Sequence, residues 1–208
     1  MREKEAVARV ILDFWINAST RRKRILSTLA VLMLALLMTV IGSLMPINAE
    51  EAEQINSEFN QTVNTLTENG VLMPYIFGNN LFICLLMFIP VAGPLLGCYI
   101  LLNTGTVIGA IAVAEGYPVA LAFFALFLTP VAWLEFAAYS VSMGESLWLF
   151  RRLLQGRGKR EFRNTCLFIT LCTVLLLVGA IAETALISIA PGSPNSAAIS
   201  FLANVFYN

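Results

Sequence analysis

The feature that most constrains this chain is the sorting of its basic residues. All thirteen lysine and arginine residues fall in two blocks, which run from Arg2 to Arg24 and from Arg151 to Arg163. Between the two blocks, and again after the second, long apolar stretches contain no basic residue. Apolar segments of about 20 residues can cross a bilayer, and loops rich in lysine and arginine stay on its cytoplasmic side. The pattern therefore predicts a membrane protein with both basic blocks in the cytoplasm.

The overall composition supports this interpretation. Only 12% of the 208 residues are charged, and the mean hydropathy is +0.79. A soluble domain typically has about 25% charged residues, so this chain has too little polar surface to cover a globule in water. A basic run can also mark a nucleic-acid site, but the flanking apolar stretches argue against one. We expect membrane lipids, and no nucleic acid, among the partners.

The residues needed for several kinds of catalysis are missing. The chain has no histidine, and Asp13 is its one aspartate, which excludes a zinc protease motif, a Ser-His pair and a pair of catalytic aspartates. The cysteines form no CxxC motif and are expected to act as small buried hydrophobic residues. We therefore expect no catalytic residue, no metal and no cofactor, and a protein that is not an enzyme. The four cysteines lie inside apolar stretches, at Cys84, Cys98, Cys166 and Cys172.

The apolar stretches predict an all-α fold, a polytopic transmembrane helix bundle of about five spans. The stretch 119–150 is too long for one straight crossing, because 32 residues of helix measure about 48 Å and a bilayer core about 30 Å. We expect it to be kinked or broken near Pro130, since proline interrupts helix hydrogen bonding. The predicted spans are 25–45, 72–89, 95–114, 119–150 and 166–189.

Three regions follow from these spans. Residues 1–24 form a cytoplasmic amphipathic helix (6–18) with a basic flank, and residues 25–190 form the bundle. Residues 191–208 form an extracytoplasmic tail with a terminal interfacial helix. The N-terminus is then cytoplasmic and the C-terminus extracytoplasmic, in a multi-pass arrangement. The lack of a targeting presequence favours the plasma membrane of a prokaryote.

The loop at 47–70 is predicted to lie outside, because it carries five glutamates and no basic residue. Within it Ile55, Phe59 and Val63 recur at helical spacing, which predicts an amphipathic helix over 51–69. The apolar stripe must cover the protein's own outer face, a second copy or a partner. Asn60 begins a glycosylation sequon on that side.

A basic loop is predicted on the cytoplasmic side at 151–163. Arg151 and Arg152 in this loop, together with Ile55, Phe59 and Val63 of the outer helix, are the candidate residues for docking a partner.

Several polar residues lie at membrane depth. A carboxylate at the bilayer centre costs about 2.5–3.5 kcal/mol, so Glu135 must face protein or a wet cavity. Glu135 is either an ion, proton or ligand site or a polar staple for the bundle, and the staple is favoured because no second carboxylate is obviously placed opposite it. Glu145 is expected to pair with Arg151, Arg152 or the first basic block. The candidate buried polar cluster comprises Glu135, Asn79, Asn80, Asn103 and Pro130.

The chain resembles the stage II sporulation protein M family of polytopic membrane proteins. That family usually shows Pro-His-Gly before an apolar-Glu pair, whereas Val131 and Ala132 follow Pro130 here, so any role of that histidine is absent. The resemblance implies that Glu135, Asn79, Asn80 and Asn103 matter. The motifs that carry it are Gly78-Asn79-Asn80, Asn103-Thr104-Gly105 with Gly109, and Pro130…Leu134-Glu135 with Gly144.

Two functions follow as hypotheses. The resemblance implies a non-enzymatic scaffold or assembly subunit, because the family's namesake is a membrane scaffold that localises cell-wall hydrolases. The partners would be other membrane or extracytoplasmic proteins, or further copies of the chain. The alternative is a permease subunit, because the layout is also similar to the membrane half of ABC-2-type exporters. A permease predicts a separate ATPase, since the chain has no P-loop, and a cavity that reaches Glu135.

Overall fold

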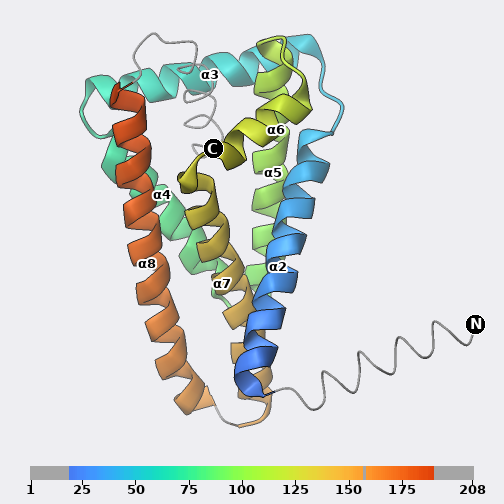
Figure 1. Cartoon of the computed structure of the whole chain (residues 1–208), viewed down its shortest axis with the longest axis vertical. Coiled ribbons are helices and arrows are strands. Elements are labelled where there is room, and N and C mark those ends of the chain that lie inside the picture. Colours follow the sequence, from blue (N-terminus) through green and yellow to red (C-terminus); the bar gives the residue numbers. More distant parts are fainter. Residues whose placement is uncertain (1–18, 157, 190–208) are drawn as a thin grey trace, which may run out of the picture.

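The computed structural model describes residues 19–156 and 158–189, so the two predicted interfacial helices, at 6–18 and 196–207, lie outside the described residues. Within the described ranges the regular elements are all α-helices (Figure 1), which confirms the predicted fold class. In chain order the helices are α2 (Thr20–Ser43), α3 (Ala49–Glu68), α4 (Leu72–Met87), α5 (Ala92–Ala114), α6 (Val119–Leu128), α7 (Pro130–Leu154) and α8 (Gly158–Ile189).

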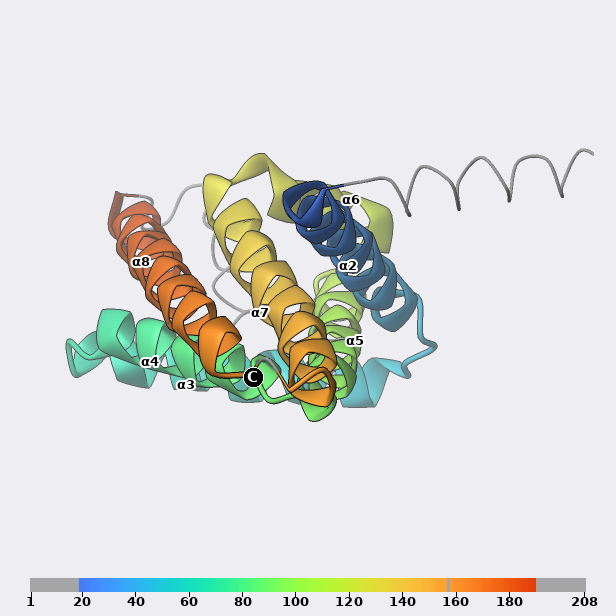
Figure 2. The same cartoon turned by 90° about the horizontal axis from the view of Figure 1, so that it is seen from below.

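Helix α7 is the centre of the bundle. It packs against α2, α4, α5, α6 and α8, and it lies between α2 and α8 when the bundle is seen from the side or from below (Figures 1 and 2). Its small and polar side chains are largely buried, from Val131 at one end to Trp148 near the other. The outer surfaces of α2, α5 and α8 instead expose large apolar side chains, as expected of helices that face lipid.

Three helices are long and apolar enough to cross a membrane: α2, α5 and the Glu161–Leu186 portion of α8. A fourth candidate span is the pair α6 and α7, if the two helices are counted as one broken crossing. Helix α4 is apolar but has only 16 residues. At about 1.5 Å per residue it measures about 24 Å, less than a bilayer core of about 30 Å. The fifth predicted crossing therefore depends on α4.

The predicted break at Pro130 is confirmed. Helices α6 and α7 meet at an angle of 87° around Thr129. Pro130 occupies the first turn of α7, where its missing N–H leaves no hydrogen bond unmade. The indole Nε1 of Trp133 donates to the carbonyl oxygen of Phe127 at 3.0 Å, which ties the two helices together across the bend.

Glycines allow α2 and α5 to pack with their backbones in contact. A Cβ atom added at Gly105 would overlap the carbonyl oxygen of Thr39, and one at Gly109 would lie 2.6 Å from the carbonyl oxygen of Ser43. Gly42, on α2, meets the backbone of α5 in the same way. Small residues four positions apart commonly allow such close approach in membrane helices, where van der Waals packing drives association.

Helix α3 lies across one end of the bundle (Figure 1). It begins and ends within two residues of the predicted 51–69, and Gly70 follows it with a φ of 65°, as expected of a helix C-cap. Phe59 is buried with Leu72, Ile76 and Ala180. The predicted apolar stripe therefore covers the chain's own bundle.

The basic region 151–163 is more helical than predicted. Instead of one loop, α7 continues to Leu154 and α8 begins at Gly158. The helices extend beyond their apolar segments because Arg151 and Arg152 complement the carbonyl-rich end of α7.

The α2–α5 contact predicts the effect of two glycine substitutions. Gly105→Leu should destabilise the protein by about 1–3 kcal/mol, because a side chain there meets rigid backbone rather than a flexible neighbour. The matched control is Gly78→Ala on α4, where a Cβ meets no atom within 4 Å. Thermal unfolding in a mild detergent compares the two variants with the original chain. Equal midpoints for both variants would contradict the proposed backbone contact.

Candidate functional site

A hydrogen-bonded chain of three polar side chains lies inside the bundle. The Nδ2 of Asn80, on α4, donates to Oε1 of Glu135 at 2.7 Å, and the hydroxyl of Tyr139 donates to Oδ1 of Asn80 at 3.1 Å. All three residues are buried, and Glu135 is only 1% exposed. Glu135 thus faces protein, as the sequence predicted, and its hydrogen-bond partner is the amide of Asn80.

A second carboxyl group lies near this chain. Glu183, on α8, is also buried and is close enough to Glu135 for the two charges to interact. In the described part of the chain, Oε2 of Glu135 and both oxygens of Glu183 have no hydrogen-bond partner. None of the ion pairs among the described residues reaches either group. An unpaired buried carboxylate is costly, so this arrangement can hold a proton or another cation, or can act as a neutral polar staple.

The other predicted members of the cluster are arranged differently. Asn79 is half-buried and has a partner of its own. Asn103 is exposed, so it does not belong to the buried cluster. On α5, Leu101 and Gly105 are buried in the bundle. Asn103 lies midway between them in sequence, so its side chain points away from the bundle. Pro130 contributes by setting the bend that starts α7, five residues before Glu135. No group of three or more metal-ligating side chains occurs among the described residues.

An ion network joins three helices at the basic end of the bundle. Nη1 of Arg24, on α2, lies 3.2 Å from Oε2 of Glu145 on α7, and Nη2 of the same residue pairs with Glu161 on α8. Nε of Arg152 lies 3.7 Å from Oε2 of Glu161. The predicted pairing of Glu145 with the first basic block is thus present. The sequence did not predict the ion pairs of Glu161, because a single acidic residue among six basic ones resembles a solvated loop residue.

Trp148 completes this network. Its indole Nε1 donates to Oγ of Ser27 at 2.8 Å, which joins α7 to α2. The guanidinium carbons of Arg24 and Arg151 lie 5.5 and 5.4 Å from the centre of its ring. A guanidinium at this distance from an indole ring is attracted by the charge distribution of the ring.

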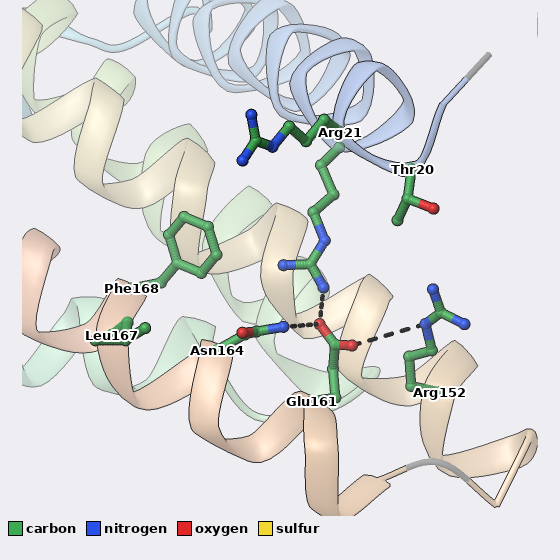
Figure 3. A pocket seen from close by; sticks show the side chains of 8 residues that line it. Thr20, Arg21, Arg152, Glu161, Asn164, Leu167 and Phe168 are labelled. Atoms are coloured by element: carbon green, nitrogen blue, oxygen red, sulfur yellow. Dashed lines mark hydrogen bonds and ion pairs between the residues drawn. The ribbon is translucent and has the colours of Figure 1, made fainter.

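A cavity of about 590 Å³ lies beside the ion network. We call it the inner cavity; its lining includes Arg21 and Arg24 from α2, Arg152 from α7, and Asn164, Leu167 and Phe168 from α8 (Figure 3). Glu135 is not among its lining residues.

The docking candidates of the outer helix face inward. Phe59 is 3% exposed, and Ile55 and Val63 are half-buried against the bundle. A partner that contacted all three would have to lift α3. At the other end, Arg151 is exposed and Arg152 is half-buried in the ion network.

These features define a class of protein. A bundle of apolar helices with lipid-facing outer surfaces, internal polar groups and a basic end is a polytopic helical membrane protein. The profile of the stage II sporulation protein M family matches residues 28–188, and the chain belongs to this family. This match confirms the resemblance carried by the short motifs. Comparison with curated proteins found no match, and neither did comparison with solved structures.

The hydrogen bonds among Asn80, Glu135 and Tyr139 predict which of two substitutions lowers the stability of the protein more. Asn80→Leu should destabilise the protein by about 1–3 kcal/mol, because it removes the hydrogen bond to Glu135 and leaves the Tyr139 hydroxyl without its acceptor. Glu135→Gln keeps an acceptor oxygen for Asn80 and should change stability by less. Thermal unfolding in detergent compares the two variants. The reverse order would show that the negative charge of Glu135, rather than its hydrogen bond, stabilises the bundle.

The ion network predicts that Arg24→Met is destabilising, by about 1–3 kcal/mol. The expected loss of stability is smaller than for breaking a fully buried ion pair, because 16% of the Arg24 side chain is exposed. The double variant Arg24→Met/Glu145→Gln should recover part of the loss, because it removes the carboxylate left without a cation, whereas Glu161 keeps Arg152. Arg22→Met, at an exposed neighbouring position, is the control. Equal loss in Arg24→Met and Arg22→Met, measured by thermal unfolding, would contradict a structural role for the network.

Proposed function

We propose that this protein is a non-enzymatic membrane scaffold or assembly subunit that docks a partner protein on the face formed by α3. The observation that carries the proposal is the way α3 is held. Two of its own side chains, Ala52 and Phe59, are buried. A third residue of α3, Asn56, donates from Nδ2 to Oε1 of Glu115 at 3.0 Å. A polar helix packed and hydrogen-bonded across the end of a bundle presents a surface already in place for a partner, and preorganisation favours binding.

The charge of this surface suggests the chemistry of the partner. The exposed side chains of α3 are acidic or uncharged and none is basic, so this surface complements a basic protein surface. No lysine or arginine lies between the two basic blocks of the sequence to neutralise it. Its acidic residues are all exposed: Glu50, Glu51, Glu53, Glu58 and Glu68.

The proposal includes an orientation in a plasma membrane. The basic residues at the start of α2 and around the α7–α8 turn lie at one end of the bundle, and α3 lies at the other (Figure 1). The excess of lysine and arginine on cytoplasmic loops supports a cytoplasmic basic end. The N-terminus is then cytoplasmic, and α3 faces the extracytoplasmic side, where a scaffold would bind its partner.

The alternative, a permease subunit, predicts a cavity that reaches Glu135. The inner cavity instead opens beside Arg24 and Glu161 at the basic end, and the hydrogen bonds of Asn80 connect Glu135 to its neighbours within the bundle. These observations favour the scaffold.

Site-specific photo-crosslinking in the native membrane tests the proposal. A photoreactive residue at Gln61, exposed on α3, should give one discrete protein adduct. The same residue at Phe82, an exposed apolar position on α4, is the control and should give lipid adducts only.

Charge reversal at α3 tests whether that adduct depends on the acidic face. The double variant Glu53→Lys/Glu58→Lys should lower the yield of the Gln61 adduct about fivefold or more, since like charges then oppose each other. Arg22→Glu, a charge reversal at the other end, should leave the yield unchanged. An adduct that survives the α3 reversal, or a partner that is a nucleotide-binding subunit, would contradict the proposal.

A further inference from the structure

The inner cavity lies at the opposite end of the bundle from α3, so the scaffold proposal does not involve it. It opens between α2 and α8, which flank α7 in both views (Figures 1 and 2). In the close-up, Arg152 lies on one side of Glu161, and Asn164, Leu167 and Phe168 lie on the other, with Arg21 across from them on α2 (Figure 3). The cavity therefore has a cationic part and an apolar part.

The cationic part of the cavity carries more positive than negative charge. Arg24 and Arg152 are matched by Glu145 and Glu161 through the ion network. Arg21 is exposed and forms no ion pair with the described residues. The lining thus includes three guanidinium groups and one carboxylate, that of Glu161. Guanidinium groups bind phosphate oxygens through paired hydrogen bonds, so the free group is suited to a phosphate.

The apolar part continues along the outer surface of the bundle. On α8, Leu167 is 65% exposed, and Leu171 follows one turn later and is also exposed. On α2, Ile25 and Leu29 follow Arg21 at four-residue spacing and are exposed as well. These side chains belong to helices that pass the length and hydropathy requirements for crossing a membrane. A ligand bound at Arg21 would therefore have an apolar surface beside it that extends toward the bilayer core.

We propose that the inner cavity binds one anionic phospholipid. Its phosphate group lies against Arg21, and its acyl chains run along Leu167 and Leu171 between α2 and α8. Basic pockets between membrane helices bind acidic lipid headgroups in this way. A free phosphate ion would use only the cationic part, and an acidic peptide would leave the lipid-facing part unused. A lipid occupies both.

Native mass spectrometry of the full chain, stripped of lipid in detergent, tests the proposal. Phosphatidylglycerol should bind with a stoichiometry of one and should displace phosphatidylcholine. Arg21→Gln should weaken this binding about fivefold, as expected for one basic residue near an anionic lipid. The matched control is Arg22→Gln, an exposed basic neighbour that does not line the cavity, and its binding should equal that of the original chain.

A second variant tests the apolar part. Leu167→Glu adds a negative charge beside the proposed acyl chains and should abolish the selectivity for phosphatidylglycerol, whereas Leu95→Glu, an exposed position on α5, should not. Equal binding of the two lipids would overturn the proposal, as would equal losses in Arg21→Gln and Arg22→Gln. Competition by inorganic phosphate at the same concentration as the lipid would show an anion site that does not recognise lipid. An acidic peptide as the true occupant would leave the purified chain without lipid selectivity.

Discussion

The guanidinium of Arg24 joins α2, α7 and α8 at the basic end of the bundle. It pairs with Glu145 and Glu161 and lies over the ring of Trp148. Because this connection is ionic and reaches across a gap, it holds α2 and α8 on either side of α7 without closing the space between them. The inner cavity lies between the same helices, and Arg24 and Arg152 of the network contribute to its cationic lining together with Arg21. Arg24 is therefore the one described side chain whose ion pairs link α2 to both α7 and α8.

Deeper in the bundle the chain handles buried carboxyl groups in another way. No lysine or arginine is available there, so Glu135 is bonded to the amide of Asn80, and Glu183 lies nearby without a partner among the described residues. An amide can donate to a carboxyl group whether or not that group carries a proton, but without a nearby cation the charged form remains costly to bury. The basic end and the interior thus differ: carboxylates at the basic end form ion pairs, whereas Glu135 in the interior accepts a hydrogen bond from an amide.

The features that could be predicted from the sequence are those set by local pattern. Hydropathy predicted the helices, and proline chemistry predicted the break at Pro130. The need of Glu145 for a nearby cation predicted a basic partner, with the first basic block as one of the alternatives. The proximity of Glu183 to Glu135, the role of Glu161 and the exposure of Asn103 were not predicted. Each depends on how far helices are rotated and shifted against each other, which is decided by packing between segments distant in the chain.

The most direct test of the scaffold account is the mass and composition of the complex that carries this chain after gentle detergent extraction of its native membrane. The account predicts a stoichiometric assembly with at least one other membrane or extracytoplasmic protein, and no nucleotide-binding subunit. A homodimer that carries an ATPase subunit would contradict the account and would assign the chain to a transporter. Recovery of the chain with no other protein would contradict it equally, because a scaffold has no function without its partner.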